Sequence, residues 1–190
     1  MRLHWGGTID AIDVIRHFVK DSYEWLEMTV SDVTQEQANW GPPGRANSIG
    51  ATYAHLMITA DAGFNSQLHG GMPIMATHFK GQIGLSEMPH AAGGWHDWSR
   101  LRVDWEQLRE YGRAVEACVL RYVDSLTLAE LTKPVDMSAY GLGAWNGLEV
   151  YKVHGMAHPR IHGGEIACLK GMQDSPGWVE RWMGTSERPT

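Results

Sequence analysis

Apolar residues recur at every third or fourth position in four long stretches of the chain, which is the spacing of a helix that buries one face. The pattern predicts helices over residues 8–29, 47–68, about 98–126 and 146–170. The third stretch is the most regular, because its apolar residues keep an a/d rhythm from Trp98 to Leu126. No stretch alternates convincingly between apolar and polar residues. We therefore expect an all-α protein without β-strands.

Residues with known preferences for helix ends support these boundaries. Asn47 or Ser48 can cap the start of the second helix, and Gly171 suits the end of the fourth. Thr34 and Thr127 are each followed three residues later by Gln or Glu, a pattern typical of a capping box. We expect each to begin a short extra helical turn. Each extra turn leads into small residues and then a histidine-bearing helix, which resembles a weak duplication of a helical hairpin. The two histidine-bearing helices would be equivalent members of the two halves, and we expect them to lie together at the centre.

The link over residues 70–95 is long and rich in glycine at both ends. Structureless links of this length are unusual in compact domains, and we expect a crossover that joins two roughly parallel helices and can also cover a site. The helices and the crossover predict one domain over residues 1–190, with a core over about residues 8–173. The tail of residues 174–190 carries Trp178 and Trp182, which are expected to pack on the bundle or on a second subunit, since tryptophan is enriched at interfaces.

Composition narrows the possible partners. The chain of 190 residues has a formal net charge of −6 and no basic run, which disfavours nucleic acid. No apolar stretch approaches the roughly 20 residues that span a bilayer, and the first residues lack the apolar run of a signal peptide. Cys118 and Cys168 lie in apolar helical patterns and form no C-x-x-C pair, which is typical of buried, reduced thiols. We expect a cytoplasmic protein with a small-molecule substrate and no nucleic acid or membrane partner.

Three histidines at four-residue steps are the main chemical feature of the chain. His154, His158 and His162 would lie on one face of the fourth helix, and His55 lies on the second. Two imidazoles four residues apart can bind one metal ion, as in H-E-x-x-H helices. His158 and His162 are the better pair, whereas His154 can replace His158, lie beyond the metal ligands or face solvent. Pro159 removes a backbone hydrogen bond and predicts a local adjustment of the helix.

Three neutral imidazoles suit Zn²⁺, Ni²⁺, Cu²⁺ or Fe²⁺ better than Mg²⁺ or Ca²⁺. A shell of three protein ligands leaves an open coordination position, where a metal lowers the pKa of a bound water or thiol. Asp61, Glu165 and His154 are the candidates for a further catalytic role beside the metal. For Asp61 and Glu165, a solvated surface position is the alternative. A histidine-rich bundle without metal is the alternative for the whole site.

The chain resembles the DinB/YfiT-like superfamily, from about Ile9 to Gln173. The resemblance is carried by residues 43–56 (Pro-Gly-Arg-Ala-Asn-Ser-Ile-Gly-Ala-Thr-Tyr-Ala-His-Leu) and 158–167 (His-Pro-Arg-Ile-His-Gly-Gly-Glu-Ile-Ala). It implies a four-helix bundle with a long crossover, frequently dimeric, that holds one divalent metal. Mapped onto this sequence, the implied ligands are His55, His158 and His162. His154 is not a matching position, and Pro159 departs from the family pattern.

Characterised members of that superfamily include thiol S-transferases that use mycothiol or bacillithiol, and a maleylpyruvate isomerase. The resemblance implies a metal-dependent thiol S-transferase that acts on small electrophiles with a low-molecular-weight thiol as co-substrate, or a related hydrolase. Zn²⁺ or Ni²⁺ is the expected metal, with Fe²⁺ as a third candidate, and no other cofactor is expected. The alternative is a non-catalytic bundle, in which the metal, or packing alone, stabilises the fold and the aromatic surfaces form a homodimer.

Overall fold

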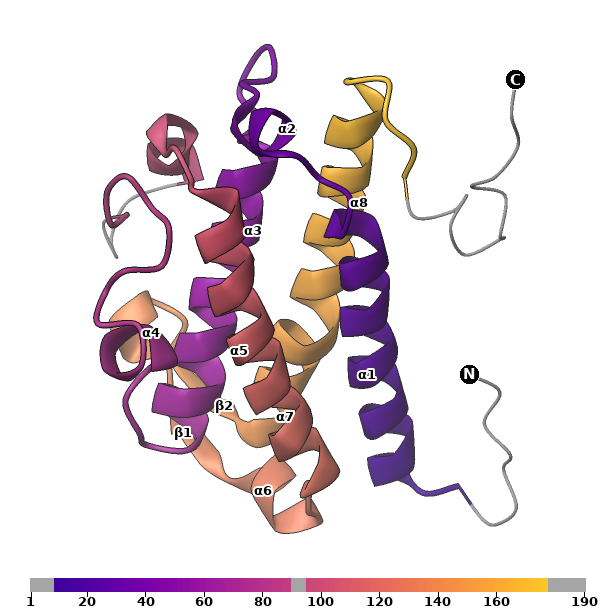
Figure 1. Ribbon diagram of the computed structural model, residues 1–190. Coiled ribbons are helices and arrows are strands. Elements are labelled where there is room, and N and C mark those ends of the chain that lie inside the picture. The colour runs from indigo at the N-terminus through magenta and orange to yellow at the C-terminus, as the bar shows by residue number, and fades with distance from the viewer. Residues whose placement is uncertain (1–8, 90–94, 178–190) are drawn as a thin grey trace.

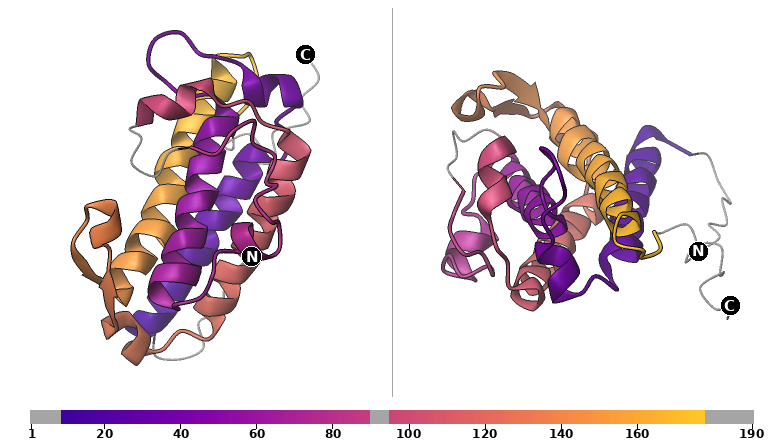
Figure 2. Two further views of the ribbon diagram at one scale, coloured as in Figure 1. Left: turned by 90° about the vertical axis from the view of Figure 1, so that its left-hand side faces the viewer. Right: turned by 90° about the horizontal axis from the view of Figure 1, so that it is seen from above.

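Four long helices lie side by side and enclose the core (Figure 1). They are α1 (Ala11–Val30), α3 (Ile49–Asp61), α5 (Trp105–Asp124) and α8 (His158–Gly171). The structure is a computed structural model that describes residues 9–89 and 95–177. α1 packs on α5 and α8, and α3 packs on the same two helices (Figure 2). The protein is therefore mostly helical, as the apolar spacing predicts.

The helix ends follow from local hydrogen bonds. The Asp10 side chain accepts from the backbone N–H of Asp13 at 2.9 Å, and the Asp13 side chain accepts from that of Asp10, which completes a capping box. The Ser48 hydroxyl accepts from the backbone N–H of Ala51 and starts α3. Of the two residues proposed as that cap, Ser48 is the one that serves.

The two predicted extra turns are confirmed as α2 (Gln35–Asn39) and α6 (Leu128–Thr132). The Thr34 hydroxyl accepts from the backbone N–H of Gln37, whose side chain accepts from that of Thr34. The Thr127 hydroxyl accepts from the N–H of Glu130 in the same way. The start of each turn is thus stabilised by hydrogen bonds between residues that are close in sequence.

Both histidine-bearing helices contain a π-helical turn. α3 continues as the π-helical segment Ala62–Leu68, and α7 (Gly147–Val150) continues as the π-helical segment Tyr151–Ala157 before α8. Pro159 has no N–H to donate to the carbonyl of His154, five residues earlier, as a π turn would require. The Tyr23 hydroxyl donates to that carbonyl instead, at 3.1 Å. The predicted local adjustment at Pro159 is therefore a π-helical turn whose freed carbonyl is bonded from α1.

The third long helix begins later than predicted. α5 starts at Trp105, and residues 95–100 form a separate 3₁₀ turn. Val103 is extended and forms a bridge with Leu85, while its N–H donates to the Asn39 side chain and its carbonyl accepts from the side chains of Asn39 and Gln35. The prediction of one helix from about residue 98 is wrong because these contacts hold the backbone extended until the cap at Asp104.

The expectation of no strands is also wrong. β1 (Pro134–Asp136) and β2 (Ala144–Asn146) form an antiparallel hairpin, with Val135 opposite Trp145. Gly141 and Gly143 in the connecting turn have φ of +74° and +71°, values that favour glycine. Strands of three residues are too short for an alternating pattern to be recognised.

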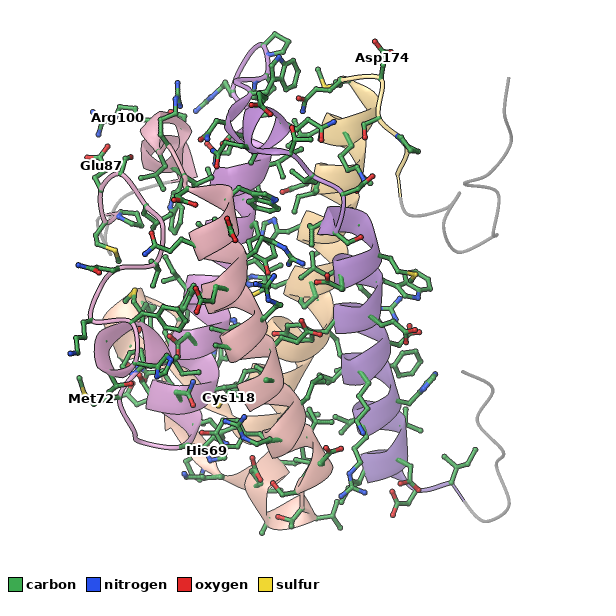
Figure 3. All side chains as sticks on the ribbon, viewed as in Figure 1. His69, Met72, Glu87, Arg100, Cys118 and Asp174 are labelled. Carbon is green, nitrogen blue, oxygen red and sulfur yellow. The ribbon has the colours of Figure 1, made fainter. Side chains whose placement is uncertain are left out.

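The link before α5 is tied to the end of α3. It contains α4 (Ile74–Thr77), and the Asp61 carboxylate accepts from the backbone N–H groups of Ile74 and Met75, each at 2.9 Å. Cys118 is buried on α5, as predicted (Figure 3), whereas Cys168 on α8 is exposed, contrary to prediction. Trp178 and Trp182 lie outside the described residues. Among the helices described, none is both long and apolar enough to cross a membrane.

Candidate metal centre

Three histidines from two helices come together in the centre of the molecule. His55 lies on α3, and His158 and His162 lie one turn apart on α8, which packs on α3. One nitrogen from each can be chosen so that all three atoms lie within 4.8 Å of one another. The ring centroid of His55 lies 5.7 Å from that of His158 and 5.2 Å from that of His162. A single ion can therefore be reached by all three imidazoles.

The environment keeps two of these rings neutral. Burial, followed by the neighbouring His162 and His158, lowers the pKa of His55 to about 3. Burial and then His162 lower the pKa of His158 to about 4, against an opposing effect of Glu165. Since a metal ligand must be an unprotonated imidazole, His55 and His158 need lose no proton to bind a metal near neutral pH.

Two oxygen atoms orient the α8 histidines. The Glu165 carboxylate lies 2.7 Å from Nδ1 of His162, and because a carboxylate only accepts, this nitrogen must donate. The Thr59 hydroxyl, which donates to the backbone carbonyl of His55 at 2.9 Å, lies 3.4 Å from Nδ1 of His158. Both contacts leave Nε2 with its lone pair for a metal, the arrangement common in histidine metal sites.

The candidate carboxylates have different positions. Glu165 is half exposed and contacts His162, so it lies beside the cluster. Asp61 is buried, contrary to the expectation of a solvated surface residue, and its oxygens accept from the Asn65 amide and the Tyr111 hydroxyl as well as from the start of α4. Asp61 is not one of the clustered residues. Its bonds instead hold the link against α3 and α5.

His154 is buried beside the cluster without belonging to it. Its ring centroid lies 5.2 Å from that of His158, and the side chain is only 6% exposed. Burial is the largest cause that lowers the pKa of His154, to about 3. Within the described part of the chain, neither of its ring nitrogens has a hydrogen-bond partner. Of the three positions considered from the sequence, solvent is therefore wrong.

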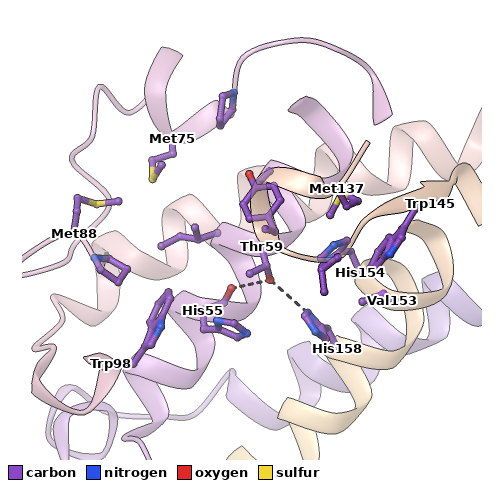
Figure 4. A pocket seen from close by; sticks show the side chains of 17 residues that line it. His55, Thr59, Met75, Met88, Trp98, Met137, Trp145, Val153, His154 and His158 are labelled. Carbon is purple, nitrogen blue, oxygen red and sulfur yellow. Dashed lines mark hydrogen bonds between the residues drawn. The ribbon is translucent and has the colours of Figure 1, made fainter. Parts of the chain in front are cut away.

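A cavity of about 690 Å³ opens beside the cluster (Figure 4). His55, His158 and His154 form part of its wall with Thr59, whereas His162 does not line it. The rest of the wall comes mainly from the link before α5, from Trp98, and from the hairpin. Thr59 was not predicted from the sequence, although it lies four residues after His55 on the same helix face. No sequence pattern indicated that the hairpin would contribute to the wall.

Comparison with known proteins identifies one family. A family model described as the DinB superfamily matches residues 20–166. A crystal structure from Enterococcus faecalis, described as that of a conserved protein, is similar with a TM-score of 0.67 and 16% sequence identity. The similarity covers 86% of this chain and 96% of that one, and at this identity it concerns the fold alone. No curated protein matches the chain in sequence.

Proposed function

Because the chain belongs to the DinB superfamily and brings three histidines together beside a cavity, we propose that it is a divalent-metal-dependent enzyme that acts on a small molecule. His55, His158 and His162 hold the metal, with Zn²⁺ or Ni²⁺ as the first candidates and Fe²⁺ as the third. The observation that carries the proposal is that a three-histidine cluster, a donor set suited to these metals, borders a cavity that two of its histidines line. In this proposal α1, α3, α5 and α8 are the four-helix bundle of the family, and the link before α5 is its crossover.

The reaction proposed first is transfer of a low-molecular-weight thiol to a small electrophile, with hydrolysis as the variant. A bound divalent metal supplies positive charge that lowers the pKa of a thiol or a water at its open position. Glu165 and Thr59 orient the rings of His162 and His158. The apolar cavity wall keeps bulk water away from the reacting groups, which strengthens electrostatic interactions between them.

Metal content tests the site directly. The untagged protein is measured by mass spectrometry as wild type, His55→Ala and His162→Ala. The matched control is His78→Ala, because His78 is an exposed histidine outside the cluster. We expect about one equivalent of metal in the wild type and the control, and its loss from both cluster variants. The proposal is overturned if the wild type holds no stoichiometric metal after reloading.

Turnover separates the enzyme from the non-catalytic bundle. Metal-loaded and metal-stripped protein are compared for formation of a thioether from 2-mercaptoethanol and 1-chloro-2,4-dinitrobenzene, with chloride as the leaving group. Metal-dependent turnover that is lost in His162→Ala supports the enzyme. A loaded protein that neither transfers thiols nor hydrolyses a panel of neutral esters and amides is a structural metal bundle.

We also propose a homodimer through the face shared by α1 and α8. Phe18 is 45% exposed on α1 and Ile161 is 57% exposed on α8, and Arg160 lies over the Phe18 ring at 5.9 Å. These two residues lie on adjacent helices that pack together, and exposed apolar side chains on adjacent elements suit a protein interface. Light scattering after size exclusion should show a dimer that Phe18→Glu with Ile161→Glu converts to a monomer, while Leu128→Glu on α6 leaves it unchanged. A monomeric wild type contradicts this proposal.

A further inference from the structure

The cavity beside the cluster has histidines on one side and mainly apolar side chains on the others. Met75 and Met88 lie across it from the histidines, and Trp98 and Trp145 stand at its flanks (Figure 4). Met137 adds a third thioether from the hairpin. Such side chains are polarisable and adapt to apolar ligands of varied shape. A volume of about 690 Å³ is in the range of sites for small organic molecules.

Charge is missing from the part of the cavity wall that the structure describes. None of its lining residues within 9–89 and 98–177 is Asp, Glu, Lys or Arg. Away from the proposed metal, a ligand carboxylate or ammonium group would leave water without meeting an oppositely charged side chain among these lining residues, which is unfavourable. The lining therefore favours an uncharged ligand body and disfavours a thiol that carries carboxylates.

His154 is one of the polar residues in this largely apolar wall, and its ring nitrogens lack partners among the described residues. Both nitrogens are buried, and the side chain lines the cavity beside His158. A buried polar group of this kind lowers stability unless something bonds to it. Its place is also shaped by the neighbouring helix, because a Cβ on Gly63 would lie 2.5 Å from its Cδ2. A neutral imidazole offers one donor and one acceptor, which a carbonyl, amide or hydroxyl can meet.

We propose that the cavity binds an uncharged, largely apolar molecule whose head binds the metal and whose neighbouring carbonyl, amide or hydroxyl group hydrogen-bonds to His154. This inference rests on the proposed function, since the head is placed by the metal of that site. His154 is a substrate-positioning residue in this arrangement. It is not a fourth ligand, because the three nitrogens that approach one another belong to His55, His158 and His162.

Three thiol probes with the same spacer between the sulfur and the aromatic ring test both parts of the inference. N-benzyl-2-mercaptoacetamide has the head, the amide and an apolar body. Its 4-carboxybenzyl analogue adds a charge, and 4-phenylbutane-1-thiol removes the amide. Each is titrated by calorimetry into protein loaded with Co²⁺, whose thiolate absorption reports that the head has reached the metal. In the wild type we expect the neutral amide to bind at least about tenfold more tightly than the carboxylate, and roughly fivefold more tightly than the phenylbutanethiol.

Three variants test which residues cause these differences in affinity. His154→Phe should remove the preference for the amide while metal content and the discrimination against the carboxylate remain. His154→Gln should restore part of that preference, because glutamine again offers a donor and an acceptor. Leu142→Lys, at a lining position that is 51% exposed, should improve binding of the carboxylate analogue without requiring a change in the core.

The outcomes separate this inference from the proposed function. Equal or tighter binding of the carboxylate analogue overturns the apolar substrate class. An amide preference that survives His154→Phe overturns the role of His154. If Co²⁺ is not taken up, or no probe gives the thiolate absorption, the proposed function itself fails. If His154→Phe does not fold, the Leu142→Lys comparison and the three wild-type affinities still decide the substrate class.

Discussion

Replacing Gly63 by alanine should destabilise the protein chiefly through His154, which supplies the three atoms nearest to the added Cβ. An ideal Cβ at this position lies 2.5 Å from Cδ2 and 2.9 Å from Nε2 of His154, whereas carbon atoms in contact are normally about 3.5–4.0 Å apart. The ring must therefore retreat by about 1 Å, in a site where it is only 6% exposed. Overpacking of this kind costs about 1–3 kcal/mol, against which alanine gains about 0.5–1 kcal/mol over glycine in a helix. The net expectation is a loss of about 0–2.5 kcal/mol.

A double-mutant cycle isolates the contact. In a His154→Ala background the obstructing ring is gone, so Gly63→Ala should stabilise by about 0.5–1 kcal/mol, which gives a coupling energy of about 1–3 kcal/mol. Gly164→Ala on α8 is the matched control, because a Cβ there meets nothing within 4 Å, and it should stabilise both backgrounds equally. The assay is urea unfolding of metal-free protein, which avoids stabilisation by bound metal. If Gly63→Ala stabilises the wild type as Gly164→Ala does, His154 does not occupy the place described.

Three further perturbations test other parts of the structure. Glu165→Gln removes the carboxylate that orients His162 at 2.7 Å, so metal affinity measured by chelator competition should fall about 10- to 100-fold; an unchanged affinity contradicts an orienting role. Asp61→Ala leaves the Tyr111 hydroxyl and the N–H groups at the start of α4 without their acceptor, which should cost about 2–4 kcal/mol and speed hydrogen exchange in α4; slow exchange there would show that the link is held otherwise. Burial, and then the nearby Glu27, raise the pKa of Glu116 from 4.5 to about 7, so the folded state binds more protons than the unfolded state in this window and stability should fall as pH rises across it. Glu116→Gln removes this pH dependence, and above pH 7 the variant should be more stable than the wild type by on the order of 1 kcal/mol. If the free energies of unfolding of the two proteins change with pH in parallel, the assignment is refuted.

Local patterns predicted the helices because each helix buries a regular stripe and carries its own cap. Ser48 and Thr34 act within three residues of themselves, so their role is visible in the sequence. The start of α5 was misplaced because Trp98 and Leu101 are also buried, and their spacing to Trp105 continues the helical rhythm. What holds Val103 extended is its pairing with Leu85 and Asn39, which are distant in sequence. No local pattern reports such contacts.

The candidate site also has a part that the sequence predicted and a part that depends on contacts between distant residues. His55, His158 and His162 were predicted to meet because helical spacing places two of them on one face and the two histidine-bearing helices were expected to lie together, and the structure brings them together. Their role as metal ligands stays a prediction. The burial of His154 depends on the absent side chain of Gly63, a relation across two helices. Met137 and Trp145 reach the cavity only through a hairpin too short to be recognised from its pattern.

If the proposed function holds, the hairpin of β1 and β2 carries residues that contact the substrate but none of the proposed metal ligands. The proposed ligands lie on α3 and α8, whose positions are fixed by the core, whereas Met137, Tyr140 and Trp145 enter the cavity from an excursion between α6 and α7. Changes in length or sequence there would alter the wall of the cavity without replacing any proposed metal ligand. Among related proteins with this fold, insertions and substitutions in the hairpin could therefore change the substrate. For engineering, the segment between α6 and α7 that contains the hairpin is a natural unit to exchange between homologues.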